Sequence, residues 1–120
     1  MKKNILIVDD NADIRDLLAE FLSGAGYQTV SADSAGAALG ILSNTCIDLV
    51  LVDIHMPEID GFAFKRMVKS SETIKDIPVV FMSGYGPQVE RAPSLVLIKP
   101  FKFDDLIKVI ELNLQSETTP

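Results

Sequence analysis

Side chains suited to phosphoryl chemistry stand at the ends of several short apolar runs in this chain. Continuous apolar runs of four or five residues are typical of parallel strands that are buried on both faces of a sheet. Ligands of such open sheets bind beyond the carboxyl ends of the strands, so we expect the polar residues that end these runs to converge. These residues are Asp9, Asp10, Asp53, Ser83 and Lys99.

Three carboxylates in one cleft would repel one another. Two unit charges about 4 Å apart interact by roughly 4 kcal/mol at an effective dielectric constant of about 20, so the acids require a cation or shifted pKa values. Oxygen ligands without His or Cys favour Mg²⁺, which proteins usually hold with one or two carboxylates and a phosphate. Lys99 would add a point charge, and Ser83 a hydrogen bond, for phosphoryl oxygens. This combination predicts an aspartate that accepts a phosphoryl group.

The composition of the chain is that of one globular domain over residues 1–120, with 48% hydrophobic and 23% charged residues. A net charge of -6 and a pI near 4.6 disfavour direct binding to nucleic acid or to an anionic membrane. The single Cys46 cannot form an internal disulfide, and we expect it to serve packing. Without a signal peptide or a long apolar run, a cytoplasmic protein is the simplest interpretation.

Hydrophobic periodicity predicts alternating strands and helices along the whole chain. Helical spacing places Leu17 on the apolar stripe of the first helix and Met67 on that of the third. Asn11 is a candidate cap for the first helix, and Gly24 and Gly26 are candidates for ending it. The alternation predicts a three-layer α/β/α sandwich with right-handed crossovers. Strands are expected over 5–8, 27–32, 49–53, 78–82 and 95–98, and helices over 11–25, 34–44, 62–70 and 104–115.

The connection between the last two strands is short. Only eleven residues, Gly84 to Ser94, join them, whereas a crossover with its helix needs about ten to twelve. A full helix does not fit there, so we expect the fourth helix of a regular crossover pattern to be shortened or absent.

Four segments in order carry a resemblance to a known family. They are Ile7-Val8-Asp9-Asp10, Val52-Asp53-Ile54-His55-Met56-Pro57 with Asp60-Gly61, Ser83-Gly84, and Lys99-Pro100-Phe101. On these segments the chain resembles a response regulator receiver domain of two-component signalling, over essentially its whole length. The resemblance implies the CheY-like (flavodoxin-like) fold, a five-stranded parallel sheet in the order 2-1-3-4-5.

The resemblance also implies roles for individual residues. Asp53 would be the phosphoacceptor, and its phosphoryl donor would be a sensor histidine kinase or a histidine phosphotransfer protein. Mg²⁺, for which Mn²⁺ could substitute, would be held by Asp9, Asp10, Asp53 and the backbone carbonyl of His55. Ser83 would be the switch hydroxyl, and Lys99 would bind the phosphate. The bond between Lys99 and Pro100 would be a cis peptide.

Two features concern regulation of the site. In the family, the positions two after the phosphoacceptor and two after the switch residue influence how water reaches the phosphoryl group. Here they are His55 and Tyr85, which leads to the hypothesis that two bulky side chains shield the acyl phosphate. The family usually has an aromatic switch residue three before the lysine, where this chain has Val96. Tyr85, next to Gly84, is the candidate substitute, although it could equally be a tyrosine packed over a short loop.

Two other classes of function remain as alternatives. A phosphohydrolase of the haloacid dehalogenase type also uses an aspartyl nucleophile, a Ser or Thr, a Lys and Mg²⁺, but it needs a second Asp where His55 stands. A receiver that has lost phosphorylation, or a flavodoxin-like protein, would act only as a binding module. We expect a switch rather than a turnover enzyme, with chemistry limited to its own phosphorylation and dephosphorylation, and with an unknown downstream effector.

Overall fold

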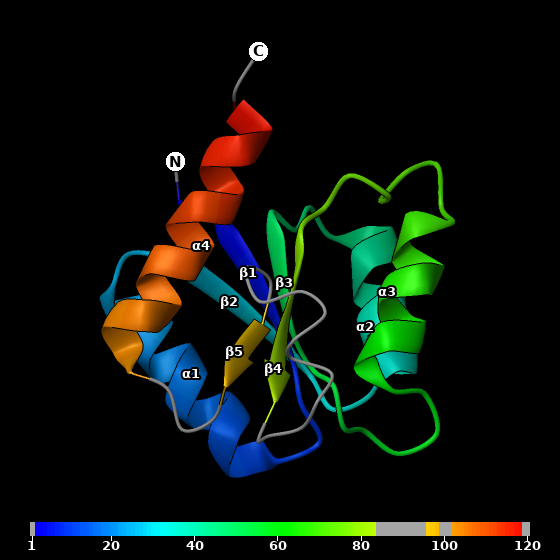
Figure 1. The fold of residues 1–120 in the computed structure, drawn as a ribbon, viewed down its shortest axis with the longest axis horizontal. Coiled ribbons are helices and arrows are strands. Elements are labelled where there is room, and N and C mark those ends of the chain that lie inside the picture. The colour runs from blue at the N-terminus through cyan, green and yellow to red at the C-terminus, as the bar shows by residue number, and fades with distance from the viewer. Residues whose placement is uncertain (1, 84–95, 99–101, 119–120) are drawn as a thin grey trace.

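The computed structural model describes residues 2–83, 96–98 and 102–118, and the side chains of residues 2–82 and 102–114. Within these ranges all strands are parallel and form one five-stranded sheet in the order β2-β1-β3-β4-β5, which confirms the predicted topology (Figure 1). The elements are β1 (Asn4–Val8), α1 (Ala12–Gly24), β2 (Gln28–Ala32), α2 (Ala35–Asn44), β3 (Leu49–Asp53), α3 (Gly61–Lys69), β4 (Val79–Ser83), β5 (Val96–Ile98) and α4 (Phe103–Thr118).

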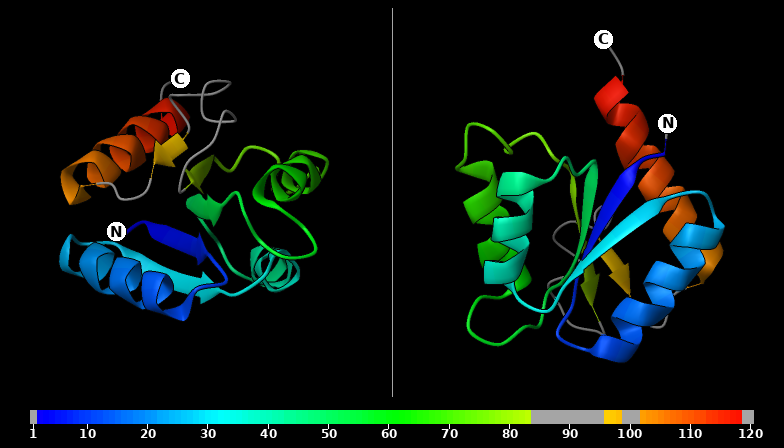
Figure 2. Two further views of the ribbon diagram at one scale, coloured as in Figure 1. Left: turned by 60° about the horizontal axis from the view of Figure 1, so that its bottom comes forward. Right: turned by 180° about the vertical axis from the view of Figure 1, so that it is seen from behind.

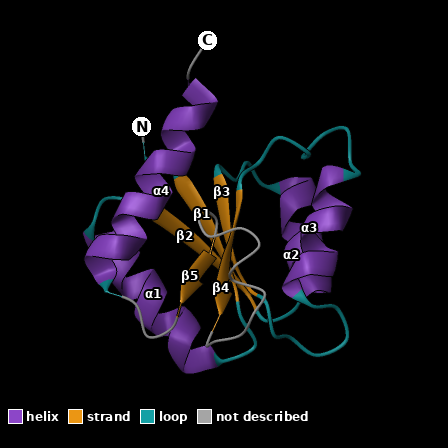
Figure 3. Ribbon diagram, in the orientation of Figure 1, coloured by secondary structure: helices purple, strands orange, loops and turns teal. Residues whose placement is uncertain are grey.

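Helices cover both faces of the sheet, as the three-layer prediction requires. Helices α1 and α4 lie on one face and α2 and α3 on the other (Figures 1 and 2), and colouring by secondary structure shows the strands enclosed between the two pairs (Figure 3). Alternate residues of the central strand β3 enter two separate core clusters, with Val50 and Val52 toward α2 and α3 and Leu49 and Leu51 toward α1 and α4. Every residue of β3 is buried, which explains its continuous apolar sequence.

Three helices begin at a side-chain cap close to the predicted boundary. The Asn11 side chain accepts a hydrogen bond from the Ile14 amide at 3.1 Å, which confirms it as the cap of α1. Ser34 caps α2 in the same way, and Asp60 caps α3 by accepting from the Ala63 amide at 2.8 Å. Each cap satisfies an amide that has no partner within its helix. The Asp60 cap places the start of α3 one residue before the predicted start.

Three sequence-based expectations about packing are wrong. Helical spacing assigns Leu17 to the buried stripe of the first helix, but it is 51% exposed, and Met67 of α3 is 42% exposed. Both lie at the margin of their stripes, while Leu18, Leu22, Phe64 and Val68 fill the core. Cys46 is exposed rather than packed, and it contributes to the structure through its carbonyl, which accepts a hydrogen bond from the Asn4 side chain at 2.8 Å.

The predicted short connection falls on residues 84–95, which lie outside the described residues, so the shortened or absent helix there stays a prediction. The described part of the chain contains four helices, α1 to α4. None of the helices in the described ranges has both the length and the apolar character that a membrane span needs.

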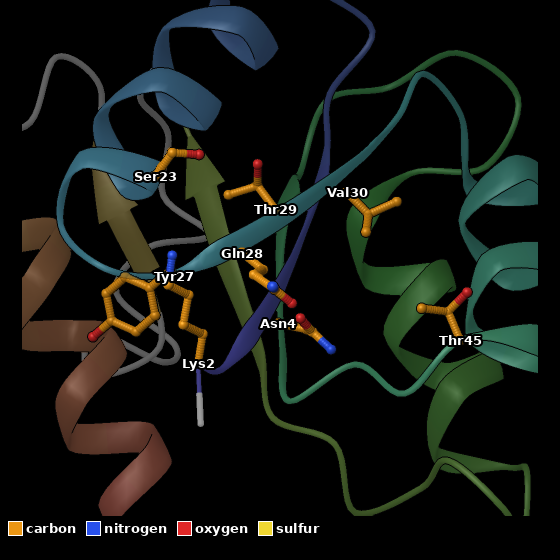
Figure 4. Close-up of a pocket in the computed structure, with 8 residues that line it drawn as sticks. All are labelled: Lys2, Asn4, Ser23, Tyr27, Gln28, Thr29, Val30 and Thr45. Atoms are coloured by element: carbon orange, nitrogen blue, oxygen red, sulfur yellow. The ribbon is translucent and has the colours of Figure 1, made fainter.

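An open pocket of about 500 Å³ lies at the amino ends of β1 and β2. Figure 4 shows its lining residues spread along β2, from the end of α1 to Thr45 after α2. They are Lys2, Asn4, Ser23, Tyr27, Gln28, Thr29, Val30 and Thr45. The described lining contains no carboxylate and no imidazole. The pocket lies at the opposite end of the strands from the predicted phosphoryl site.

Candidate metal and phosphoryl site

Asp9, Asp10 and Asp53 come together at the carboxyl edge of the sheet. One carboxylate oxygen from each lies within 4.8 Å of the other two. The register of the sheet explains this, because Val8 of β1 pairs with Val52 of β3 and an aspartate comes next in the chain after each of them. Asp9 is fully buried, Asp53 is 7% exposed, and Asp10 is exposed. The predicted convergence of the three acids is therefore present in the structure.

The two buried carboxylates are each held by a backbone amide two residues further along the chain. Oδ1 of Asp9 accepts from the Asn11 N–H at 2.9 Å, and Oδ1 of Asp53 accepts from the His55 N–H at 3.1 Å. In such turns a nearby backbone N–H supplies the buried carboxylate with a hydrogen bond and fixes the direction of its side chain. The His55 side chain is exposed, as expected for a histidine on a loop.

The loop between β3 and α3 folds back closely onto the backbone of Asp53. The Gly61 N–H donates to the Ile54 carbonyl at 2.9 Å. A methyl carbon at Gly61 would lie 2.8 Å from the Asp53 carbonyl oxygen and 2.9 Å from the Ile54 Cα, so a glycine is required. Glu58 adopts a left-handed backbone with φ 68°, and the Ile59 N–H donates to the Pro57 carbonyl at 2.8 Å. This compact loop fixes the end of β3.

The acidic cluster fits a hard divalent cation. Two oxygens bound to one Mg²⁺ at about 2.1 Å are at most about 4.2 Å apart, and the three oxygens here lie within 4.8 Å of one another. Small side-chain movements would close that gap. Because Mg²⁺ keeps several waters, it does not need direct contact with all three carboxylates. The cluster offers only carboxylate oxygens and lacks the Cys sulfur and His nitrogen ligands that Zn²⁺ prefers.

Several predicted site residues lie outside the described residues. Gly84, Tyr85, Lys99 and Pro100 belong to this group, so their predicted roles stay predictions. Ser83 is the last residue of β4, at the carboxyl edge, but its side chain lies outside the described part.

Two features near the site were missed by the sequence reasoning. Arg15 of α1 turns back to the end of β1, where its Nη1 donates to the Asp9 carbonyl at 2.7 Å. On β4, two residues before Ser83, the Phe81 ring contacts Phe62 edge-on with centroids 4.8 Å apart, and Lys65 Nζ lies 5.4 Å from its centroid. Neither contact has a sequence signal, because each depends on where a helix lies relative to a strand.

Comparisons with known proteins agree with this geometry. The family described as "Response regulator receiver domain" matches residues 5–111. Regulatory protein AtoC of Escherichia coli is 34% identical over 121 residues, which cover 95% of this chain and 26% of AtoC. The phosphate regulon transcriptional regulatory protein PhoB of Pseudomonas aeruginosa is 32% identical over 111 residues, which cover 88% of this chain and 48% of PhoB.

A solved structure supports the same assignment. The signal receiver domain of a signal transduction histidine kinase from Syntrophus aciditrophicus superposes with a TM-score of 0.86 at 30% identity, covering 98% of this chain and 94% of that one. The chain therefore belongs to the response regulator receiver domain family. It spans between about a quarter and a half of the length of the curated relatives AtoC and PhoB.

Proposed function

We propose that Asp53 accepts a phosphoryl group from a sensor histidine kinase or a histidine phosphotransfer protein, and that this modification changes a surface read by a downstream effector. The observation that carries the proposal is the approach of the Asp9, Asp10 and Asp53 carboxylates to within 4.8 Å at the sheet edge. Three like charges at one edge are unfavourable without a cation, and a phosphoryl transfer site uses such a cation.

In the proposed transfer, a carboxylate oxygen of Asp53 attacks the phosphorus atom of the donor in line with the bond that breaks. With a phosphohistidine donor, the P–N bond breaks and its electron pair stays on the imidazole nitrogen. The product is a mixed anhydride between phosphate and the Asp53 carboxyl group. The His55 amide, which donates to Oδ1 of Asp53 at 3.1 Å, would hold the carboxylate in position during the attack.

Receiver domains bind Mg²⁺ at an acidic pocket, and the cluster of Asp9, Asp10 and Asp53 carboxylates supports such a site in this chain. Asp9, Asp10 and Asp53, with the backbone carbonyl of His55, would hold the ion, and Mn²⁺ could replace it. When bound, the ion would offset the repulsion between the carboxylates and the incoming phosphoryl oxygens.

The remaining proposed roles belong to residues on the neighbouring strands. The Lys99 ammonium would neutralise phosphoryl oxygens, and the Ser83 hydroxyl would donate to one of them and report the modification to the rest of the domain. The backbone at Gly84 and a cis peptide before Pro100 would shape this side of the site, and Tyr85 would respond to the Ser83 hydroxyl in place of the aromatic absent at Val96.

The whole of residues 1–120 would act as one such domain, located in the cytoplasm. The chain would be a switch and would not turn over a separate substrate. Its partners would be proteins, with no direct contact to nucleic acid or membrane, and they would recognise the phosphorylated state through a shift in the population of conformations.

The test is the intact mass of the protein after incubation with acetyl phosphate and Mg²⁺. We expect one added phosphoryl group on the wild-type protein, none on Asp53→Ala, and none when a chelator removes the metal. Asp48→Ala, which removes an aspartate from the other end of β3, serves as the matched control and should still be modified. An adduct of equal yield on Asp53→Ala would refute the assignment of the phosphoacceptor.

The shielding hypothesis has its own measurement. The exposed His55 stands two residues after the proposed phosphoacceptor, where its side chain can hinder the approach of water. We expect His55→Ala to lose the phosphoryl group faster than the wild-type protein, and Tyr85→Ala to do the same. Equal dephosphorylation rates would remove His55 and Tyr85 from this role without affecting the role of Asp53.

A further inference from the structure

The Arg15 side chain forms a hydrogen bond outside its own helix, to the backbone next to the acidic cluster. It is the fourth residue of α1 and is half-buried. Its side chain turns back toward the sheet, where Nη1 donates to the Asp9 carbonyl at 2.7 Å. A short bond from a guanidinium to a carbonyl is a charge-assisted hydrogen bond, stronger and more directional than a neutral one. Arg15 thus links α1 to the residue that directly follows β1.

Asp9, whose carbonyl receives this bond, is held by two further hydrogen bonds. The Asp9 N–H donates to the Ala32 carbonyl of β2 at 3.2 Å, and the Asp9 carboxylate accepts from the Asn11 N–H at 2.9 Å. Asp9 is fully buried, so losing the Arg15 bond would remove a hydrogen bond from a group that is shielded from water in the intact structure. The carbonyl belongs to the peptide plane that leads into Asp10, and a rotation of that plane would redirect the Asp10 side chain.

Asp10 is the site carboxylate that most needs such support. Asp9 and Asp53 are each held by an amide two residues along the chain. Asp10 is exposed, and its carboxylate accepts no hydrogen bond from the residues that the structure describes. The Asp10 backbone therefore sets the direction in which this side chain leaves the chain, and the Arg15 bond is one of the contacts that hold that backbone.

We infer that Arg15 is a positioning residue of the divalent cation site, acting through the Asp9–Asp10 peptide to aim the Asp10 carboxylate at the ion. The inference rests on the proposed function, because it needs Asp10 to face a bound Mg²⁺. Groups that orient metal ligands without touching the metal commonly contribute about tenfold or more to metal affinity. Arg15 stands in that relation to Asp10.

The sign of the effect separates positioning from simple electrostatics. A guanidinium near the site repels a cation, so if charge alone mattered, removing Arg15 would tighten Mg²⁺ binding. If positioning dominates, removing Arg15 weakens binding although a repulsive charge is lost. A purely structural role would lower the thermal stability of the metal-free protein and leave the affinity of the folded protein unchanged.

The experiment is isothermal titration of Mg²⁺ into the wild-type protein, Arg15→Met, Arg15→Gln and Arg15→Lys, with Asp10→Asn as the variant that lacks the ligand. We expect Arg15→Met and Arg15→Gln to bind Mg²⁺ about tenfold more weakly, and Arg15→Lys to recover part of the loss because it keeps a charged donor. Arg66→Met is the matched control, since Arg66 is exposed on α3, and its affinity should stay within about twofold of the wild-type value.

The outcomes distinguish the inference from the proposed function. If the wild-type protein binds Mg²⁺ and both neutral Arg15 variants bind it equally or more tightly, the positioning role is wrong and the phosphoacceptor proposal stands. If the wild-type protein binds no Mg²⁺, both fail together. Should Arg15→Met not fold, Arg15→Gln makes the same comparison with a side chain that keeps a neutral donor.

Discussion

Asp48 and Asp53 stand at the two ends of β3 and use their carboxylates in opposite ways. Asp48 lies just before the strand, and its carboxylate accepts a hydrogen bond from the backbone N–H of Asn4 at 2.7 Å. The backbone N–H of Asp48 donates to the backbone carbonyl of Asn4 at 2.8 Å. Asp53, the last residue of the strand, has the carboxylates of Asp9 and Asp10 within 4.8 Å. At the amino end of the sheet, a carboxylate accepts a hydrogen bond from a backbone N–H. At the carboxyl end, three carboxylates lie close together although they repel one another.

The difference indicates which end is built for stability and which for chemistry. At the amino end, the Asp48 carboxylate accepts a hydrogen bond from the backbone N–H of Asn4. At the carboxyl end, a tight loop and two hydrogen bonds donated by backbone N–H groups hold like charges together, an arrangement that costs stability unless a ligand of opposite charge is present. Removing a contact at each end should therefore have different consequences for stability and for phosphorylation.

The largest expected effect is at the carboxyl end, where Gly61 packs on the backbone of Asp53. Gly61→Ala should lower the free energy of unfolding by about 1–3 kcal/mol, because the new methyl group meets backbone atoms that cannot move aside. It should also slow phosphorylation, since Asp53 would shift. Chemical denaturation and the rate of mass gain with acetyl phosphate measure both effects.

A matched glycine gives the control for this variant. Gly40 lies inside α2, where an added methyl group would meet nothing within 4 Å. Gly40→Ala should therefore raise the free energy of unfolding by about 0.5–1 kcal/mol through helix propensity alone. Equal effects of the two substitutions would contradict the close packing of Gly61.

The second prediction concerns the amino end. Asp48→Ala should lower the free energy of unfolding by about 1–2 kcal/mol, because the Asn4 amide loses a charge-assisted acceptor. Phosphorylation of the folded protein should be unchanged. Asp76→Ala provides the control, since Asp76 is exposed and its carboxylate makes no hydrogen bond or ion pair with the described residues. A loss of phosphorylation in folded Asp48→Ala would show that the two ends of β3 are not independent.

The third prediction is a gain in stability at the carboxyl end, where the first prediction is a loss. Asp10→Asn should raise the free energy of unfolding in metal-free buffer by a few tenths of a kcal/mol to about 1 kcal/mol, because one of three clustered charges is removed from an exposed position. The gain should shrink as salt is added. Thermal denaturation with a chelator present measures it, and a loss of stability at low salt would mean that the carboxylates do not repel as the geometry indicates.

The strands and the acidic edge could be predicted from the sequence for a simple physical reason. A central parallel strand must be apolar on both faces, so β1 and β3 appear as unbroken apolar runs, and the residue after such a run must lie at the sheet edge. This rule places Asp9 and Asp53 at the same edge of the sheet, and the pairing of β1 with β3 makes them neighbours. The burial of residues at the edge of a helix's apolar stripe, such as Leu17, was less predictable. The width of a buried stripe depends on how far the neighbouring element extends.

The supporting contacts of the site could not be predicted. The left-handed backbone at Glu58 occurs in a residue that rarely adopts it, and the approach of Gly61 to Asp53 is set by the path of the whole loop. Arg15 has a long side chain with many rotamers, and nothing in its spacing from Asp9 indicates that it turns back to β1. The sequence thus identified groups suited to the chemistry, while the groups that orient them became visible only from the fold.

The smallest expected effect lies at the amino end, in the titration of Tyr27. Burial of its half-buried ring raises the pKa of the Tyr27 phenol, and the negative charge of Glu111 raises it further. The folded protein therefore holds this proton more tightly than the unfolded chain. Its contribution to stability is complete below the unfolded pKa of about 10 and is lost as the pH rises through the higher folded pKa.

Tyrosinate absorbance in a Tyr85→Phe background reports Tyr27 alone, because the chain has 2 tyrosines. Glu111→Gln should move the pKa of Tyr27 part of the way back toward its ordinary value, by less than burial raises it. Asp10→Asn should leave this pKa unchanged, because Tyr27 precedes β2 at the end of the sheet opposite the acidic cluster. A pKa of Tyr27 that fell in Asp10→Asn would mean that the two ends of the sheet are electrostatically coupled, and the separation between a structural end and a chemical end would not hold.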